Sequence, residues 1–392
     1  MKKRILIVNK SFELGGIQSS MVNMANELSN HYDVDMFLYN PEGVMKERLD
    51  KRVNVLWPSW RLRCLAMPLG EVIKTRSPRM IMFRAFATLW TKLFSNRLPV
   101  GIAIRHQYRL GEYDLAIAYH QEQRKKSVIS GFSRLVCERV DAKRRATWLH
   151  YDSSKIDLDS RYNNPFYKKM DKLVCVSKSL MESFSKRHGE LSDKMDYCYN
   201  FMLYDEIKEK SMLVEDTPYP SDKFICFSAC RLTEEKALVR AVNSLADVFK
   251  SHPDLVWYIA GDGVEREKIE AAIKENSLEG RIVLLGHKNN PYPYMRGADL
   301  MMNVSYHEAA PMIFLESKSL GVPVFATRTS SADEFLSDGV DSFVCDNSES
   351  GIRERFTYLM ENRGLISCAC ERLSGYHFSN DSSVSKIKEL VS

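Results

Sequence analysis

The 392-residue sequence contains no apolar stretch long enough to span a membrane, which takes about 20 residues. Its first apolar run, Ile5-Leu6-Ile7-Val8-Asn9, follows Met1-Lys2-Lys3-Arg4 and is too short for the hydrophobic region of a secretory signal. No small-residue cleavage site follows the run. We therefore interpret it as a first buried strand and expect a cytoplasmic protein.

The nine cysteines are odd in number and include no Cys-x-x-Cys pair. Both features argue against a disulfide framework and against a zinc site. Several of the cysteines stand within apolar runs, where we expect them to be small core residues.

Acidic residues are scarce between residues 51 and 110, where twelve Lys or Arg accompany a single acid, Glu71. The local charge is thus +11, against +5 for the whole chain. Aromatic and apolar residues alternate with the bases, a composition typical of a surface that binds anionic membranes. The alternative is an ordinary solvated basic face. We expect no nucleic-acid binding, because no known binding motif accompanies the charge.

Short apolar runs alternate with helical stretches along the whole chain, which predicts an α/β fold with parallel sheets and helices on both faces. The pattern restarts near residue 224, after a polar segment with two prolines over 214–222. We therefore expect two doubly wound, Rossmann-like domains facing a cleft, over 1–213 and 214–375. A last helix within about 376–392 is expected to pack back on the first domain.

In such sheets, ligands bind beyond the carboxyl ends of the strands. The expected strands are followed there by glycines, histidines, an arginine and a glutamate: Gly15-Gly16, His120, His150, Arg231, Gly261-Asp262-Gly263, Gly286-His287 and Glu308. Each residue alone is a weak signal, and a lone histidine is more often structural. Their shared placement is the stronger argument for a site.

Arg231 and Lys236 stand where an apolar run passes into a helix. Two cations beside a helix N-terminus stabilise the negative charge that develops on a departing phosphate. The simpler explanation for this hexapeptide alone is a surface Arg and Lys at the start of a helix.

Glu308 and Glu316 bracket the run Ala309-Ala310-Pro311-Met312, and Pro311 suits the first turn of a helix ending near Leu320. The two carboxylates are expected to accept hydrogen bonds from sugar hydroxyls. The alternative is that Glu316 is a solvated helical residue. A zinc-protease motif at Glu308 is excluded, because Pro311 stands where its second histidine belongs.

These motifs together resemble the family 4 retaining glycosyltransferases, also called glycosyl transferases group 1, which have the GT-B fold. The resemblance is strongest from Phe224 to about Cys345 and is carried by the following residues: Arg231, Lys236, Gly261-Asp262-Gly263, Gly286, Ala298-Asp299-Leu300, Glu308, Glu316, Leu320-Gly321-Val322-Pro323-Val324, Glu334 and Gly339. Gly15-Gly16 match the family's N-terminal glycine loop, and His150 lies where a sugar-binding histidine is usual.

The resemblance implies that the first domain binds the acceptor and the second the nucleotide-sugar donor. The catalytic residues would be Glu308, His150, Arg231 and Lys236. The donor-binding residues would be Gly16, Arg231, Lys236, Gly263, His287, Glu308, Ala310, Met312 and Glu316. The resemblance implies no metal and no cofactor, and we interpret the pairs Asp33-Val34-Asp35 and Asp157-Leu158-Asp159 as structural.

One departure concerns the residue after Glu308, which is Ala309 where the family usually has glycine. It bears on the identity of the donor sugar more than on activity.

The function expected from these observations is transfer of a hexose from a nucleotide-diphosphate sugar, UDP-sugar before GDP-sugar, to a lipid-linked saccharide in surface polysaccharide biosynthesis. The enzyme would work peripherally at the inner face of the cell membrane. Two alternatives stay open at this point: a nucleotide-sugar 2-epimerase on the same fold, and a non-catalytic partner subunit. Fold alone does not separate them.

Overall fold

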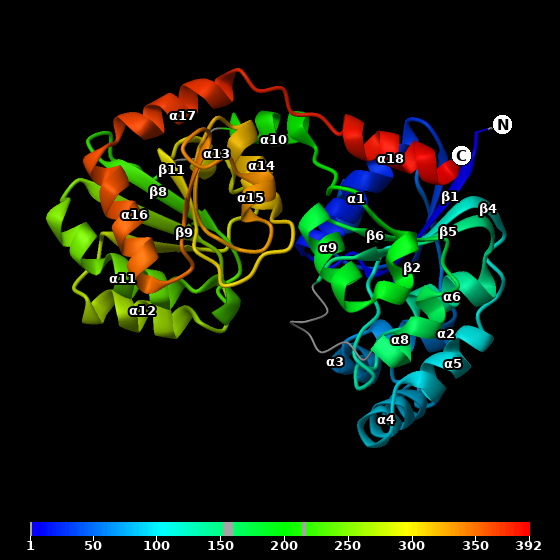
Figure 1. The fold of residues 1–392 in the computed structure, drawn as a ribbon. Helices are drawn as coiled ribbons and strands as arrows, with labels where there is room; N and C mark the ends of the chain where they lie inside the picture. Colours follow the sequence, from blue (N-terminus) through cyan, green and yellow to red (C-terminus); the bar gives the residue numbers. More distant parts are fainter. Residues whose placement is uncertain (1, 152–159, 214–216) are drawn as a thin grey trace. The chain divides into compact units, whose positions relative to one another are not determined.

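The computed structural model describes residues 2–151, 160–213 and 217–392, with the side chains of 160–163 left out, and it divides the chain into two compact units. The first unit comprises Met1–Phe201 and Asn380–Ser392, and the second comprises Met202–Ser379 (Figure 1).

The first unit contains a parallel seven-stranded sheet in the order β3-β2-β1-β4-β5-β6-β7. The order reverses between β1 and β4, so right-handed crossovers place helices on both faces. The strands are β1 (Arg4–Ser11), β2 (Asp33–Asn40), β3 (Asn54–Leu56), β4 (Glu112–Ala118), β5 (Asp141–Leu149), β6 (Lys172–Cys175) and β7 (Met195–Tyr197).

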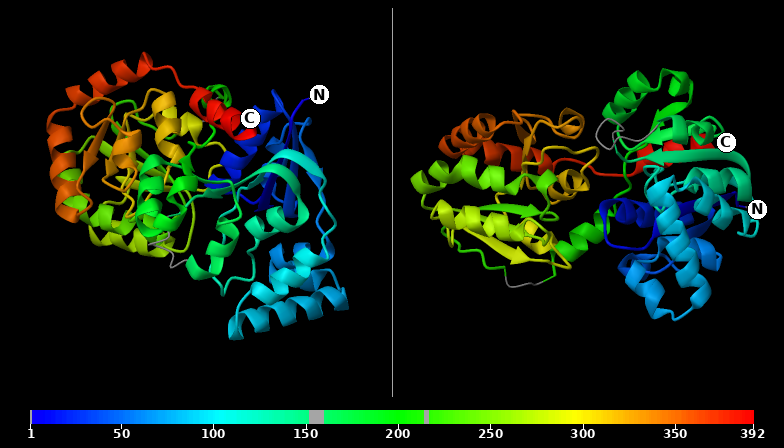
Figure 2. Two further views of the ribbon diagram at one scale, coloured as in Figure 1. Left: turned by 45° about the vertical axis from the view of Figure 1, so that its right-hand side comes forward. Right: turned by 90° about the horizontal axis from the view of Figure 1, so that it is seen from below.

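The helices of the first unit are α1 (Gly16–Ser29), η1 (Val44–Arg48), α2 (Trp60–Ala66), α3 (Leu69–Lys74), α4 (Pro78–Leu93), α5 (Arg97–Arg105), α6 (Phe132–Arg139), α8 (Ser160–Tyr167), α9 (Lys178–Arg187), η2 (Gly189–Lys194) and α18 (Asp381–Val391). Helices α2 to α5 pack on one another as a group beside β2, and α4 is the outermost of them (Figures 1 and 2). No helix in the described ranges combines the length and apolar content that crossing a bilayer requires.

The final helix, α18, belongs to the first unit. Lys386 pairs with Asp196 at 3.2 Å, and Lys3 Nζ donates to Val391 O over 2.9 Å. The units divide after Phe201 and again before Asn380, whereas we expected the first boundary after residue 213.

The helix α10 (Tyr204–Ser211) explains why the first boundary lies before residue 213. It packs on α13 and α14 of the second unit instead of on the first sheet.

The second unit contains a parallel six-stranded sheet in the order β10-β9-β8-β11-β12-β13, which reverses between β8 and β11. Its strands are β8 (Phe224–Ala229), β9 (Leu255–Ala260), β10 (Ile282–Gly286), β11 (Leu300–Asn303), β12 (Val324–Thr327) and β13 (Ser342–Cys345). Its helices, beside α10, are η3 (Glu234–Lys236), α11 (Leu238–Ser251), α12 (Arg266–Glu275), α13 (Tyr292–Arg296), α14 (Met312–Ser319), α15 (Ala332–Phe335), α16 (Glu349–Glu361) and α17 (Gly364–Ser374).

Two hydrophobic cores cover the two faces of this sheet, because neighbouring side chains along a strand point to opposite faces. Cys226 and Trp257 pack with α11, α12 and α16, whereas Phe227 and Tyr258 pack with α13 and α14. Both cores therefore hold the carboxyl ends of β8 and β11 next to each other.

One member of the first Asp-x-Asp pair has hydrogen-bond partners in the first sheet. Asp35 lies in β2 and accepts hydrogen bonds from Arg4 Nη2 at 2.9 Å and from Tyr113 Oη at 2.6 Å. The second pair, at 157 and 159, lies outside the described residues.

Candidate functional site

The carboxyl ends of β8 and β11 bring Lys236 and Glu308 together. Lys236 ends the short helix η3 after β8, and Glu308 lies in the loop after β11, at the point where the strand order reverses. Lys236 Nζ donates to Glu308 Oε1 over 2.6 Å, and the two side chains are only 20% and 12% exposed. Such a shielded pair is screened little by salt.

Two more donors hold the same carboxylate oxygen. Ser305 Oγ donates to Glu308 Oε1 over 2.7 Å, and Asn303 Nδ2 donates to it over 3.5 Å. In the described ranges, every hydrogen bond to the carboxylate falls on Oε1, which leaves Oε2 to accept from a bound hydroxyl. The buried Oδ1 of Asn303 also has no partner among the described residues.

Backbone contacts fix the two loops that carry this pair. Tyr306 N donates to Glu235 O over 2.9 Å and thereby ties the β11 loop to the β8 loop. Ser330 Oγ and Ser331 Oγ each donate to Glu308 O over 3.1 Å. The carboxylate is therefore positioned from both its side chain and its main chain.

The surroundings of Lys236 favour its charged form. Burial lowers the pKa of Lys236, but the charge of Glu308 and its hydrogen bond outweigh burial, so the pKa ends above its ordinary value. The ammonium has three N–H donors, and the bond to Glu308 uses one of them.

Arg231 is placed differently from Lys236. Its side chain is 77% exposed, and its Nη2 lies 3.6 Å from Glu235 Oε1. The predicted pair of cations thus separates, within the second unit, into a shielded lysine and an exposed arginine. A guanidinium so exposed is free to reorient toward an anion at the carboxyl edge of the sheet.

Glu316 lies on α14, which begins at Met312, one residue later than we expected from Pro311. Tyr292 Oη donates to Glu316 Oε1 over 3.3 Å. Ala310 precedes Pro311, and both Ala310 and Met312 are partly exposed at the start of the helix. Glu316 itself is partly buried.

The glycine loop after β9 has a packing role. A Cβ atom on Gly263 would lie 2.3 Å from Leu232 O, and one on Gly261 would lie 1.8 Å from Cys230 O. These glycines let the loop pass close to the β8 loop that carries Lys236. His287 follows β10 and is exposed.

In the first unit, His150 follows β5 and is buried. Its Nε2 lies 2.7 Å from Tyr119 O, and its main-chain N donates to Gln121 Oε1 over 2.9 Å. Burial lowers the pKa of His150 to about 3 and that of His120 to about 4, so both imidazoles are neutral at pH 7.

Gly16 is the first residue of α1, and a Cβ atom there would meet nothing within 4 Å. No packing demand explains this glycine, whereas a Cβ atom on Gly15 would lie 2.7 Å from Gln18 Oε1.

The sequence reasoning missed the positioning role of Ser305 and Asn303. Ser305 precedes Glu308 by three positions and Asn303 precedes it by five. The only sequence signal for this role was that both polar residues stand at the end of an apolar run. Their hydrogen bonds to Glu308 depend on how the β11 loop folds back, which the local sequence does not show.

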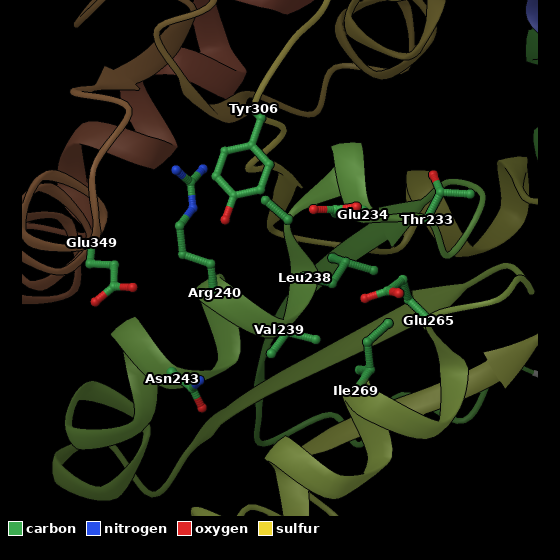
Figure 3. A pocket seen from close by; sticks show the side chains of 11 residues that line it. Thr233, Glu234, Leu238, Val239, Arg240, Asn243, Glu265, Ile269, Tyr306 and Glu349 are labelled. Atoms are coloured by element: carbon green, nitrogen blue, oxygen red, sulfur yellow. The ribbon is translucent and has the colours of Figure 1, made fainter.

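A cavity of about 270 Å³ lies beside this site (Figure 3). Thr233, Glu234 and Ala237 of the β8 loop line it, together with Tyr306 and Glu265, which precedes α12. The other lining residues belong to three helices: Leu238, Val239, Arg240, Asn243, Ile269 and Glu349. Lys236 and Glu308 are not among its lining residues. Arg240 and Tyr306, which both line the cavity, stack with the guanidinium 4.1 Å from the ring centroid. Since neither Lys236 nor Glu308 lines the cavity, we regard it as a neighbour of the site and not as the site itself.

Residues 210–374 match the family model described as glycosyl transferases group 1. This part of the chain is similar to the group 1 glycosyl transferases, and it contains Lys236 and Glu308.

Two curated proteins match over shorter stretches. The chain is 31% identical over 190 residues to the N-acetylgalactosamine-N,N'-diacetylbacillosaminyl-diphospho-undecaprenol 4-alpha-N-acetylgalactosaminyltransferase of Campylobacter jejuni. It is 24% identical over 154 residues to the lipopolysaccharide core biosynthesis glycosyltransferase LpsE of Rhizobium meliloti. The matches cover 48% and 39% of this chain, and the chain spans less than half of either relative, 45% and 44%.

Among solved structures, Anabaena HepE in complex with UDP aligns with a TM-score of 0.70 and 17% identity over 98% of each chain. At this identity the likeness shows the fold, which is the GT-B fold with two parallel-sheet, Rossmann-like domains.

Proposed function

We propose that this chain, whose residues 210–374 are similar to the group 1 glycosyl transferases, is a glycosyltransferase that moves a hexose from a nucleotide-diphosphate sugar to a saccharide acceptor. The observation that carries the proposal is the shielded Lys236–Glu308 pair at the reversal of the second sheet. A cation and an acid held at that edge suit a donor that combines a diphosphate with a hydroxylated sugar.

The role of Lys236 follows from its remaining N–H groups, which can donate to oxygens of the departing diphosphate. Negative charge grows on that group as its bond to the sugar breaks, so a fixed ammonium stabilises the transition state more than the ground state. Exposed Arg231 can grip two further oxygens of the same group.

Glu308 would bind the transferred sugar through Oε2, while Ser305 and Lys236 hold Oε1. Glu316 would accept from the ribose hydroxyls, and Gly16 and His150 of the first unit would contribute to the donor sugar and the acceptor. Gly263, His287, Ala310 and Met312 would complete the donor-binding set.

Transfer is proposed to retain the anomeric configuration without a metal or cofactor. The bond from the anomeric carbon to the diphosphate breaks, the acceptor oxygen bonds to the same face, and the leaving phosphate takes the acceptor proton. A chelator should therefore leave the rate unchanged, and loss of activity that Mg²⁺ restores would contradict this mechanism.

The proposed donor is a UDP-sugar, and the proposed acceptor is a lipid-linked saccharide of a surface polysaccharide. The curated relatives named for an undecaprenol-linked acceptor and for lipopolysaccharide core support the acceptor class, and the UDP complex of the HepE structure supports the base. The enzyme would lie in the cytoplasm, peripherally at the inner face of the cell membrane.

The test is a thermal-shift comparison of UDP, GDP and their common sugars, because a ligand that binds the native state raises its apparent stability. We expect UDP to raise the melting temperature of the wild type more than GDP does. We expect Lys236→Met to lose most of the shift. Equal shifts in the two proteins would remove the site assignment.

A second assay separates the transferase from the epimerase that the sequence leaves open. The protein is incubated with a UDP-sugar panel with and without a saccharide acceptor. A transferase releases UDP at a rate that rises with the acceptor, whereas a 2-epimerase converts the sugar nucleotide without it. No turnover under either condition, with UDP still bound, would indicate a non-catalytic subunit.

A further inference from the structure

The helix α4 of the first unit turns its apolar side chains outward. Met82 is 71% exposed, Leu89 is 61% exposed and Leu93 is 63% exposed, and Phe86 lies between them at the spacing of one helical face. Phe94 directly follows the helix and is also exposed. Large exposed apolar patches on soluble proteins mark interaction surfaces.

The inward side of α4 combines apolar, small and polar groups, and Met80 and Phe83 pack against the cluster of Cys64, Met67 and Val72. Ala87 and Thr91 are its fully buried residues. Arg84 also points inward, where its Nη1 donates to Cys64 O over 2.9 Å and to Leu65 O over 2.5 Å at the end of α2. The helix is thus anchored through this side, whereas Met82, Leu89 and Leu93 stay more than half exposed on the other.

A row of aromatic rings runs along the same helix. The ring centroids of Phe83 and Phe86 lie 6.3 Å apart, those of Phe86 and Trp90 lie 5.9 Å apart, and those of Trp90 and Phe94 lie 4.6 Å apart. Aromatic side chains are favoured where an apolar layer meets water.

Basic residues flank both ends of this apolar face. Lys74, Arg76 and Arg79 are exposed at the amino end of α4, and Lys92 is exposed in its last turn. Figure 1 and the left view of Figure 2 show the helix on the outside of the first unit, away from the sheet.

The fold adds three more bases that lie far away in the sequence. Arg124, Lys125 and Lys126 are exposed in the loop after β4. Asn96 N donates to Lys125 O over 2.8 Å, and Lys126 Nζ donates to Lys92 O over 2.7 Å, so this loop is held against the carboxyl end of α4. The segment 51–110 alone underestimates the positive charge around the apolar face.

We propose that the outward face of α4 (Met82, Phe86, Leu89, Leu93 and Phe94), with the bases at its two ends, binds the surface of an anionic lipid bilayer. An interfacial helix buries its apolar face at the boundary of headgroups and acyl chains, and bases around it attract anionic headgroups. This inference deepens the membrane part of the proposed function and rests on it for its biological setting.

A second copy of the chain is the competing occupant of this face. Two such faces would bring the same basic clusters together without acids to neutralise them, and like charges oppose that pairing. Charge complementarity therefore favours an anionic bilayer.

The test measures co-sedimentation of the full chain with phosphatidylcholine vesicles, with and without phosphatidylglycerol. We expect binding to the anionic vesicles and release at high salt, because exposed charges are screened over about 8–10 Å. The apolar variant Met82→Gln/Leu89→Gln/Leu93→Gln and the charge variant Arg76→Gln/Lys92→Gln/Lys125→Gln should each weaken binding about tenfold or more.

The matched controls change exposed residues of the second unit. Val340→Gln/Tyr358→Gln/Leu365→Gln removes three exposed apolar side chains, and Lys250→Gln/Lys274→Gln/Arg353→Gln removes three exposed bases. Neither control should change vesicle binding.

Three results would overturn the proposal. The apolar variant could bind anionic vesicles as the wild type does, or the wild type could bind neutral and anionic vesicles equally. The wild type could also be a dimer in solution that becomes monomeric only in the apolar variant. UDP binding without vesicles is measured on every variant. Loss of vesicle binding with UDP binding intact concerns this face, whereas absent UDP binding in all proteins concerns the proposed function.

Discussion

Lys236 Nζ lies 2.6 Å from Glu308 Oε1, although 72 positions separate the two residues in the chain. The contact depends on the adjacency of β8 and β11 in the second sheet, because each residue stands just beyond the carboxyl end of one of these strands. The pair is therefore a product of topology, and the chemistry we propose depends on it.

Removing the carboxylate of Glu308 should lower activity far more than removing the Ser305 hydroxyl that donates to it. We expect Glu308→Gln to lower kcat by about two to three orders of magnitude, as for other groups that act in the transition state. Ser305→Ala should lower kcat by about tenfold, because one hydrogen bond to a charged group is lost. Steady-state kinetics on the donor measure both effects.

Ser305 is a positioning residue in this scheme, so the conservative variant Ser305→Thr should restore most of kcat without changing the donor KM. Ser374→Ala removes a hydroxyl that bonds only to Glu371 O on α17, and it serves as the matched control. Equal rates for Ser305→Ala and this control would contradict the role of Ser305.

Adding a methyl group at Gly263 should disturb the loop that carries Lys236. A Cβ atom there would lie 2.3 Å from Leu232 O, and relieving such a contact costs about 1–3 kcal/mol of the free energy of unfolding. Gly364→Ala is the control, because its Cβ atom would meet nothing within 4 Å at the start of α17. Urea denaturation and UDP binding should both weaken for Gly263→Ala alone.

The buried pair of Lys318 and Asp341 should be sensitive to loss of one partner. Lys318 Nζ lies 2.7 Å from Asp341 Oδ2, and both side chains are almost fully buried. Lys318→Met should cost about 3–5 kcal/mol, because the carboxylate stays buried without its cation.

The exposed pair of Arg355 and Asp338 is the control for that change. Arg355→Met should cost less than about 1 kcal/mol, as surface ion pairs do. The double variant Lys318→Met/Asp341→Asn should cost less than the sum of its single changes. Full additivity in urea denaturation would show that the two residues do not interact.

The stability of the chain should fall as the solution is acidified below pH 6.5. Burial lowers the pKa of His150 to about 3 and that of His120 to about 4, so the unfolded chain binds protons that the folded chain excludes. The stabilisation is complete above the unfolded pKa of about 6.5 and is lost as the pH falls toward the folded values.

Each imidazole contributes a slope of up to about 1.4 kcal/mol per pH unit in that window. Melting curves from pH 7 to pH 4 test this slope, which should be smaller in His120→Gln and His150→Gln. An unchanged slope in both variants would show that these imidazoles already titrate freely in the folded protein.

The alternation of apolar runs and helices was sufficient to predict two parallel-sheet domains. It missed β3 and β7, the two edge strands of the first sheet. Each has only three residues, Asn54–Leu56 and Met195–Tyr197, so neither presents an apolar run long enough to recognise.

The positions of two candidate residues relative to each other were predicted from the sequence. Lys236 and Glu308 were predicted to lie at one edge and they meet there, whereas Arg231 is exposed and pairs with Glu235. Ser305 and Asn303 were missed because a hydrogen bond to a single carboxylate oxygen is decided by loop geometry, which local sequence does not encode.

By itself, the sequence determined the fold class and showed that Lys236 and Glu308 follow the carboxyl ends of strands. Strand periodicity and the residues that follow each strand are local properties. Only the tertiary structure decided which side chains of α4 face outward, which bases join them from the loop at 124–126, and which oxygen of Glu308 stays available. All three features depend on packing between segments that are far apart in the chain. Burial against a distant segment has no signature in the local sequence.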